Sequence, residues 1–198
     1  CMRCHDSDNY EQHMLCTVNP LVGVEEAAEK IPAATKSKTV AVIGGGPAGM
    51  LAAVTAAQRG HKVTLLEKDD RLGGKLNFAD HVAFKYPLAA YKNWLVSQVE
   101  KAGVAIRLNT EATPEHMAGF DAVIAALGAE PVIPPIAGAA KAKIAINVYG
   151  RENELAEHVA IVGGGQEGVE TALHLTGLGK KVTILEMQPE LAPDASKT

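Results

Sequence analysis

The hydrophobic positions of this chain alternate between short continuous runs and longer segments with helical spacing. Apolar runs of strand length are followed by stretches in which apolar residues return every three or four positions. This alternation is typical of an α/β fold with parallel strands connected by helices. We expect strands over residues 39–43, 62–66, 104–108, 122–127, 158–162 and 182–185, and helices over residues 48–59, 88–102 and 166–179.

One strand–turn–helix–strand pattern occurs twice. Residues 40–68 read VAVIGGGPAGMLAAVTAAQRGHKVTLLEK and residues 159–187 read VAIVGGGQEGVETALHLTGLGKKVTILEM, so 13 of 29 positions are identical at an offset of 119 residues. Each copy has the glycine spacing G-x-G-x-x-G and a glutamate at the end of its second strand. One such unit binds one dinucleotide, so two units predict two dinucleotides and electron transfer between them.

The first copy places its glycines at Gly44, Gly46 and Gly49. Gly44 permits a tight turn, Gly46 lets the backbone approach a pyrophosphate, and Gly49 lets the helix pack closely on the strand. Glu67 ends the second strand, where a carboxylate can accept hydrogen bonds from two ribose hydroxyls. A purely structural glycine turn would not require this acid.

The second copy repeats the pattern with Gly163, Gly165, Gly168 and Glu186. A carboxylate at position 186 would repel a 2′-phosphate, and no Arg or Lys follows it directly. The second unit is therefore expected to bind NADH in preference to NADPH.

Three cysteines, Cys1, Cys4 and Cys16, lie within the first 16 residues, and the rest of the chain has none. An odd, clustered set without an export signal indicates metal binding rather than disulfides. Three alternatives stay open: covalent haem at the C-x-x-C-H pattern of residues 1–5, zinc with His5 or His13, and replacement of a missing thiolate by Asp8 or His5.

Composition and charge further limit the kinds of binding partner that we expect. The 198 residues are 47% apolar and 21% charged, with a net charge of −4 and a pI of about 6.0. No cluster of Lys and Arg stands out, so neither nucleic acid nor a membrane surface is an expected partner. No apolar stretch reaches the roughly 18 residues of a membrane span, and no signal peptide is visible, so a cytoplasmic location is expected.

Two further segments, Arg71-Leu72-Gly73-Gly74-Lys75 and Leu127-Gly128-Ala129-Glu130-Pro131, give the chain a resemblance to FAD/NAD-linked flavoproteins with two dinucleotide-binding domains. This resemblance implies a three-layer, Rossmann-like α/β fold with FAD in the first unit and NAD(P)H in the inserted second unit. By carry-over, the residues that would contact FAD are Gly44, Gly46, Pro47, Ala48, Glu67, Lys68, Gly74, Leu76, Ala112 and Gly128.

The N-terminal segment Cys16-Thr17-Val18-Asn19-Pro20, with Gly23 and Glu25, resembles the iron–sulfur relatives of old yellow enzyme. That group includes 2,4-dienoyl-CoA reductase, trimethylamine dehydrogenase and enoate reductases. The resemblance implies that the three cysteines are ligands two, three and four of a [4Fe–4S] cluster. It also implies an upstream FMN-binding barrel, absent from this sequence, in which an activated C=C bond is reduced with electrons passed from NADH through FAD and the cluster.

The expected domains are an iron–sulfur segment and connector over residues 1–30, the first part of an FAD domain over 31–135, and a truncated NAD(P)H domain over 136–198. The chain is thus expected to be a piece of a larger oxidoreductase that uses cofactors and no catalytic side chain. Two rivals are a module like the small subunit of glutamate synthase and a non-catalytic nucleotide-binding domain. The helical face with Tyr91, Trp94 and Leu95 is expected in the core.

Overall fold

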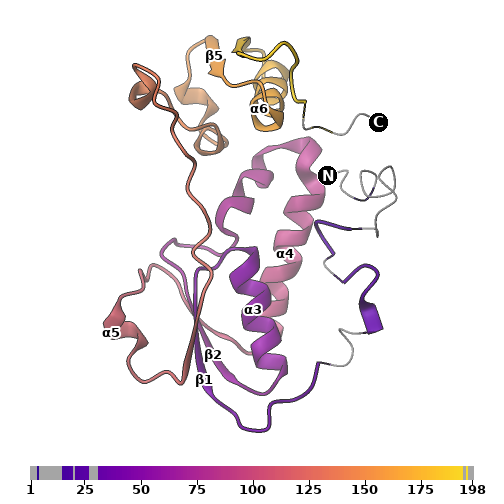
Figure 1. Cartoon of the computed structure of the whole chain (residues 1–198), viewed down its shortest axis with the longest axis vertical. Coiled ribbons are helices and arrows are strands. Elements are labelled where there is room, and N and C mark those ends of the chain that lie inside the picture. The colour runs from indigo at the N-terminus through magenta and orange to yellow at the C-terminus, as the bar shows by residue number, and fades with distance from the viewer. Residues whose placement is uncertain (1–3, 5–14, 20, 27–30, 194, 196–198) are drawn as a thin grey trace. The chain divides into compact units, whose positions relative to one another are not determined.

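A computed structural model describes residues 4, 15–19, 21–26, 31–193 and 195 of the chain (Figure 1). The chain divides between Glu130 and Pro131 into two compact units. Each unit contains one parallel β-sheet. Of the helices in the described ranges, none has the length and apolar character that crossing a lipid bilayer requires.

The first unit is built on a four-stranded parallel sheet. Its strands are β1 (Thr39–Ile43), β2 (Lys62–Leu66), β3 (Ala105–Arg107) and β4 (Ala122–Ala125), in the spatial order β3-β2-β1-β4. In the register, Val40 of β1 lies opposite Val63 of β2 and opposite Ala122 of β4. β1 is an inner strand of the sheet, and its middle residues are buried.

Two helices, α3 (Pro47–Gln58) and α4 (Tyr86–Lys101), pack against each other beside this sheet (Figure 1). Pro47 suits the first position of α3, where no backbone N–H is needed. Small residues, including Gly49, Ala53 and Ala56, form much of the buried face of α3, so the helix can approach the strands closely. The largest fully buried side chains of this core are Met50, Leu65, Leu66, Leu95, Val42 and Val99.

The connections of the first unit contain more helix than we predicted. The segment over residues 69–85, for which neither a strand nor a helix was predicted, forms the 3₁₀-helices η1 (Gly74–His81) and η2 (Ala83–Lys85). α4 begins two residues before the predicted start, because Pro87 is tolerated in a first helical turn. A short helix, α5 (Pro114–Met117), lies in a region without a prediction.

The expectation that Trp94 lies in the core is wrong. Its side chain is 50% exposed and stacks on Tyr91 at a centroid distance of 5.9 Å, whereas Leu95 is fully buried as expected. The reason is helical geometry, because adjacent positions on a helix point about 100° apart, so Leu95 and Val99 face the core whereas Trp94 does not.

The second unit contains β5 (His158–Val162), α6 (Gln166–Gly177) and β6 (Lys181–Leu185). β5 and β6 are parallel, and α6 packs on both. The strands alternate between exposed and half-buried positions, as expected when a helix covers one face. Three 3₁₀-helices precede β5: η3 (Ala139–Lys141), η4 (Ala145–Asn147) and η5 (Glu152–Glu154).

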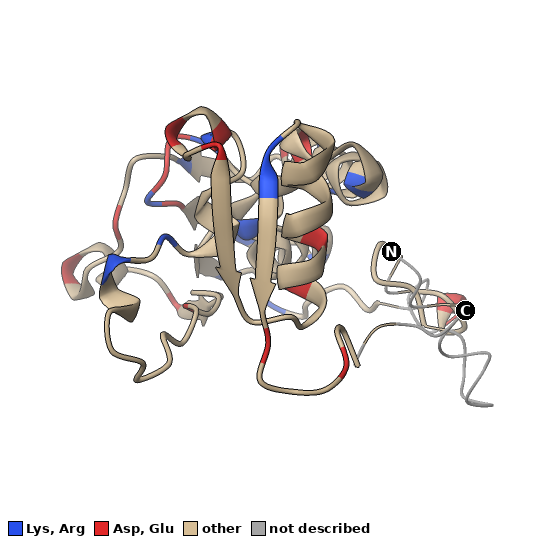
Figure 2. Cartoon of the chain, turned by 90° about the horizontal axis from the view of Figure 1, so that it is seen from above, with Lys and Arg blue, Asp and Glu red and all other residues tan. Residues whose placement is uncertain are grey.

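Basic and acidic positions are interspersed along the described chain (Figure 2). Ion pairs such as Lys143 with Glu154 and Lys181 with Glu157 lie on the surface, where they add little stability. Lys92 differs from these, because it is 6% exposed and pairs with Asp80.

Candidate dinucleotide-binding sites

The first glycine turn lies at the carboxyl end of β1, where the order of the strands reverses. β2 and β3 follow β1 on one side of the sheet, whereas β4 pairs with its other side. In open parallel sheets, ligands bind outside the carboxyl ends of the strands at such a switch point. The turn leads directly into α3, whose first N–H groups and positive dipole end attract phosphate.

The glycines of this turn meet different physical requirements. Gly44 has φ of +101°, and a side chain there would collide with the carbonyl oxygen of Ala126. A Cβ on Gly49 would overlap the carbonyl oxygen of Gly44. A Cβ on Gly46, in contrast, would have no neighbour within 4 Å. The fold therefore requires Gly44 and Gly49, whereas Gly46 leaves space for a ligand at the start of α3.

Glu67 is a buried carboxylate at the carboxyl end of β2. It is 5% exposed, its Oε2 accepts a hydrogen bond from the Gly45 N–H at 2.5 Å, and its Oε1 accepts one from the Asp69 N–H at 2.9 Å. These bonds hold the carboxylate beside the glycine turn. Because each carboxylate oxygen has about two acceptor sites, one on each remains for a hydroxyl group.

The Gly73–Gly74 turn lies directly against the glycine turn. The Gly73 N–H donates to the carbonyl of Gly45 at 2.9 Å, and a Cβ on Gly74 would lie 3.0 Å from the Cα of Gly46. Both residues have positive φ, +118° and +53°. The structure therefore brings together Gly44, Gly46, Glu67 and Gly74, four of the predicted FAD contacts, with Gly49 of the same glycine pattern.

The other predicted FAD residues follow the carboxyl ends of the strands of this sheet. Parallel strands have these ends on one edge, so the residues lie along the same edge as the glycine turn. Pro47 and Ala48 open α3, Lys68 is exposed after β2, Leu76 is half-buried in η1, Ala112 is half-buried after β3, and Gly128 is exposed after β4.

The second unit reproduces the glutamate hydrogen bonds of the first turn and the close approach of its first and third glycines. Gly163 has φ of +107°, and a Cβ on Gly168 would overlap its carbonyl oxygen. The Gly164 N–H donates to Oε2 of Glu186 at 2.6 Å, and the Gln188 N–H donates to Oε1 at 2.8 Å. These N–H groups, Gln188 first and then Gly164, hold the pKa of Glu186 below its ordinary value.

The structural repeat extends beyond the sequence repeat that we recognised, which ended at residue 187. Ala192 lies 119 positions after Gly73, and its N–H donates to the carbonyl of Gly164 at 2.7 Å, just as Gly73 donates to Gly45. Ala192 also has positive φ, +46°. The signal that could have shown this extension is Leu72, which recurs as Leu191 at the same offset.

The two units differ in what surrounds the turn. At Gly44 the end of β4 closes the space that a side chain would need, and the Ala126 N–H donates to the carbonyl of Ile43 at 2.8 Å. At Gly163 no described atom lies within 4 Å of the corresponding position, because β5 has β6 as its one partner among the described strands. Gly165, the equivalent of Gly46, likewise has space around it, because a Cβ there would have no neighbour within 4 Å.

A group of polar side chains anchors the connection before β5 to α6. The hydroxyl groups of Tyr149 and Thr171 lie 2.8 Å apart, and Nε2 of His174 lies 2.7 Å from Oε1 of Glu152. Burial raises the pKa of Tyr149. For Glu152, burial acts in the same direction, but hydrogen bonds from the Gly150 N–H and from His174 outweigh it and lower the pKa. These side chains are largely buried, and their hydrogen bonds hold the connection against α6.

The predicted metal ligands lie in a part of the chain that is only partly described. Cys1 is outside the described residues, Cys4 is exposed, and Cys16 is half-buried, with neither of the latter two in a disulfide. Within the described ranges, no group of three or more Cys, His, Asp and Glu side chains is placed to hold a metal ion. The iron–sulfur site therefore stays a prediction.

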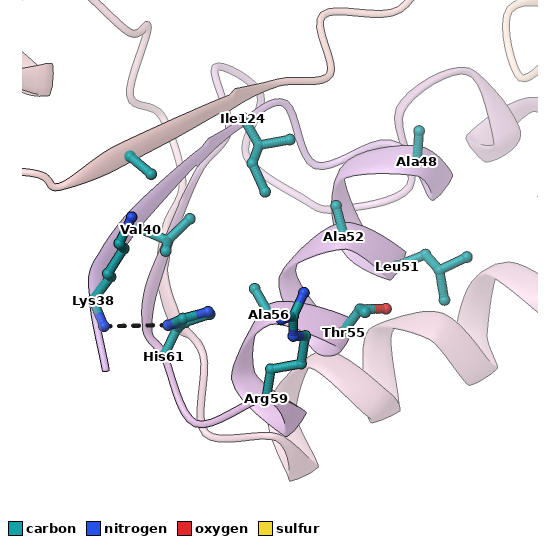
Figure 3. Close-up of a pocket in the computed structure, with 11 residues that line it drawn as sticks. Lys38, Val40, Ala48, Leu51, Ala52, Thr55, Ala56, Arg59, His61 and Ile124 are labelled. Atoms are coloured by element: carbon teal, nitrogen blue, oxygen red, sulfur yellow. Dashed lines mark hydrogen bonds between the residues drawn. The ribbon is translucent and has the colours of Figure 1, made fainter. Parts of the chain in front are cut away.

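An open apolar groove of about 710 Å³ lies between α3 and the strands β1 and β4 (Figure 3). Leu51, Ala52, Val40 and Ile124 line it, and Arg59 and His61 lie at one end, where Nδ1 of His61 accepts a hydrogen bond from the Lys38 N–H. Neither Gly46 nor Glu67 lines this groove. Of the predicted FAD residues, Ala48 alone is among those that line the groove.

Comparison with known proteins identifies the family. Residues 38–198 match the pyridine nucleotide-disulphide oxidoreductase family, and the chain belongs to it. The chain is 43% identical over 189 residues to an NADH oxidase of Thermoanaerobacter brockii, and 42% identical over 178 residues to a cinnamate reductase of Clostridium sporogenes. These alignments cover 90% and 89% of this chain, but only 29% and 27% of the two relatives.

Among solved structures, a 2-naphthoyl-CoA reductase in complex with 2-naphthoyl-CoA matches 98% of this chain with a TM-score of 0.90 and 32% identity. The chain covers 30% of that protein. These findings confirm the α/β Rossmann-like fold, the oxidoreductase class and the resemblance to the dinucleotide-binding portion of the iron–sulfur flavoenzymes. Membership in the family supports binding of FAD and NADH.

Proposed function

We propose that this chain is the electron-input module of an NADH-dependent flavoenzyme, with FAD at the first glycine turn and NADH at the second. The observation that carries the proposal is the recurrence of one hydrogen-bonded turn, with its buried or partly buried glutamate, at a constant offset of 119 residues. When bound, FAD accepts the hydride that NADH supplies and can release electrons singly. The chain itself binds and orients the two cofactors.

In the first unit, different residues are proposed to contact different parts of FAD. The open space at Gly46 and the first turn of α3 suit the pyrophosphate. Glu67 has free acceptor sites for ribose hydroxyls. The full set comprises Gly44, Gly46, Pro47, Ala48, Gly49, Glu67, Lys68, Gly74, Leu76, Ala112 and Gly128.

In the second unit, Gly163, Gly165, Gly168 and Glu186 are proposed to hold NADH. Glu186 would accept hydrogen bonds from the ribose and repel a 2′-phosphate. The next two residues, Met187 and Gln188, offer no cation to such a phosphate. This charge pattern supports NADH as the preferred nucleotide.

The wider assignment rests on the relatives. Cys1, Cys4 and Cys16 would supply three thiolates of a [4Fe–4S] cluster, and thiolate is the ligand that such clusters use. An FMN-binding barrel upstream in the same protein would reduce an activated C=C bond. The similarity to a cinnamate reductase and to a 2-naphthoyl-CoA reductase favours this partner over the amidotransferase partner of a glutamate synthase module.

The test uses the purified full-length protein under anaerobic conditions. We expect released FAD at about one equivalent per chain, bleaching of the flavin absorbance near 450 nm on addition of NADH, and iron together with FMN in the same preparation. A colourless protein that binds ADP alone would instead identify a non-catalytic nucleotide-binding domain. Flavin and iron without FMN would overturn the barrel partner but not the FAD and NADH sites.

A further inference from the structure

A buried cation lies behind the Gly73–Gly74 turn. Lys92 of α4 is 6% exposed, and its ammonium group forms an ion pair with Asp80 of η1. Lysine is rarely buried unless it is paired, because removing an ammonium group from water has a large free-energy cost. The pair therefore requires an explanation that the two dinucleotide sites do not supply.

The side chain of Lys92 lies directly against the turn. A methyl group on Gly73 would lie 2.8 Å from Cδ of Lys92 and would overlap Oδ1 of Asn77. This Asn77 oxygen is buried and has no hydrogen-bond partner among the described residues. Gly73 thus lies on the stem of Lys92 with no space between them.

The opposite side of the turn faces the proposed flavin site. The Gly73 N–H donates to the Gly45 carbonyl at 2.9 Å, and Gly45 in turn donates to Glu67. A Cβ on Gly74 would lie 3.0 Å from the Cα of Gly46. Contacts therefore run without interruption from the Lys92–Asp80 pair, through the turn, to the glycine that leaves space for the pyrophosphate.

The second unit has the same turn with a different residue in the place of Gly73. Ala192 replaces Gly73 and keeps the equivalent hydrogen bond to Gly164. Its φ is +46°, whereas φ of Gly73 is +118°, a value that a residue with a side chain rarely adopts. The hydrogen bond alone does not require glycine. The backbone of Gly73 fits the closely packed Lys92 and Asn77 side chains.

We propose that the Lys92–Asp80 pair is a positioning device that fixes the Gly73–Gly74 turn beside Gly46 and thereby sets the affinity for FAD. The ion pair links α4 to η1, the helix that begins at Gly74. Lys92 lies against Gly73 and would act on the cofactor site through the turn, so it is a positioning residue. The inference rests on the proposed function, because it assumes FAD at the first turn.

The test compares five variants in the full-length protein: four single substitutions and the double variant that combines Lys92→Met with Asp80→Asn. Lys92→Met keeps the length of the side chain and removes its charge. Asp80→Asn removes the partner at a site where the side chain is 31% exposed, so no cavity opens in the core. Lys92→Arg preserves the charge, and Lys101→Met, at an exposed position in the last turn of the same helix, is the matched control.

The measurements are the Kd for FAD, obtained by titrating apoprotein, the reduction potential of the bound FAD, and the melting temperature of the apoprotein. We expect Lys92→Met and Asp80→Asn each to raise the Kd for FAD about tenfold. Because the two residues act together, the Kd of the double variant should be no higher than that of either single variant. The reduction potential of the bound FAD should shift in the same variants. Lys92→Arg, which keeps the positive charge, should bind FAD much more tightly than Lys92→Met. Lys101→Met should have the Kd and the potential of the wild type.

Unchanged Kd and potential in Lys92→Met and Asp80→Asn, with or without a lower melting temperature, would overturn the inference and leave a purely structural ion pair. In that case the wild type still binds FAD, and the proposed function stands. A wild-type protein that takes up no FAD would overturn the proposed function and this inference together. The two failures are therefore distinguishable in one experiment.

Discussion

Replacement of Gly46 by valine should separate the stability of the first unit from its ability to bind a dinucleotide. Gly46 is the N-cap of α3, with φ of −72° and ψ of 179°, which is extended backbone that any residue adopts. A Cβ there would have no neighbour within 4 Å. The preference of N-cap positions for glycine over valine limits the expected loss of unfolding free energy in the apoprotein to about 1 kcal/mol.

The effect on binding should be larger than the effect on stability. The space at Gly46 is where a pyrophosphate would approach the N–H groups of the turn and of α3. A hydrogen bond to a charged group contributes about 1.5–3 kcal/mol, and valine would displace at least one such bond. Since 1.4 kcal/mol corresponds to a factor of ten, FAD binding should weaken by about 10–150-fold.

The assay is titration of the apoprotein of the full-length chain with FAD, accompanied by urea unfolding of the same preparation. Gly165→Val is the matched control, because Gly165 caps α6 with φ of −66° and ψ of −178° and is equally open. It should leave the Kd for FAD unchanged and raise the KM for NADH. Full FAD affinity in Gly46→Val, or loss of FAD in Gly165→Val, would refute the assignment of the two cofactors to the two turns.

Three other predictions concern the same turns and their support. Gly49→Ala should destabilise the first unit by at least about 1–3 kcal/mol, because its Cβ would overlap the Gly44 carbonyl, and urea unfolding should show a lower midpoint even without FAD. Glu186→Ala combined with Gln188→Arg should shift the ratio of kcat/KM for NADH over NADPH toward NADPH, and an unchanged ratio would contradict the role of Glu186. Asp121 accepts hydrogen bonds from the N–H and the hydroxyl of Thr39, which lower its pKa in the folded state. Its stabilising effect should therefore be complete above the ordinary value of 3.8 and disappear as pH falls through the lowered value, so the difference in urea midpoint between wild type and Asp121→Asn should close progressively as the pH is lowered below that ordinary value.

The sequence predicted those features that depend on local chemistry. The strands and main helices were identified within a few residues, because apolar periodicity and glycine spacing act over short segments. The positions of Gly44 and Gly49 in the turn, and of Glu67 beside it, followed from the same spacing.

What the sequence did not reveal depends on contacts between segments. Lys92 occupies an ordinary polar position in a helical pattern, and its burial follows from Asp80, which belongs to another element. Glu67 and Glu186 accept hydrogen bonds from backbone N–H groups of the glycine turns, and these bonds form only when the strand and the turn lie side by side in the fold. The equivalence of Ala192 and Gly73 was hidden because the two residue types differ and only the backbone conformation and its hydrogen bond are shared.

The duplication of the glycine turn has a consequence for how the two halves diverged. Because the same glutamate contact and the same overlap at Gly49 and Gly168 occur in both, these features of the turn would not by themselves distinguish a flavin from a nicotinamide nucleotide. Any selectivity between the two nucleotides would then reside in what differs between the copies, such as the end of β4 beside Gly44 and the acidic Glu167 in the first turn of α6.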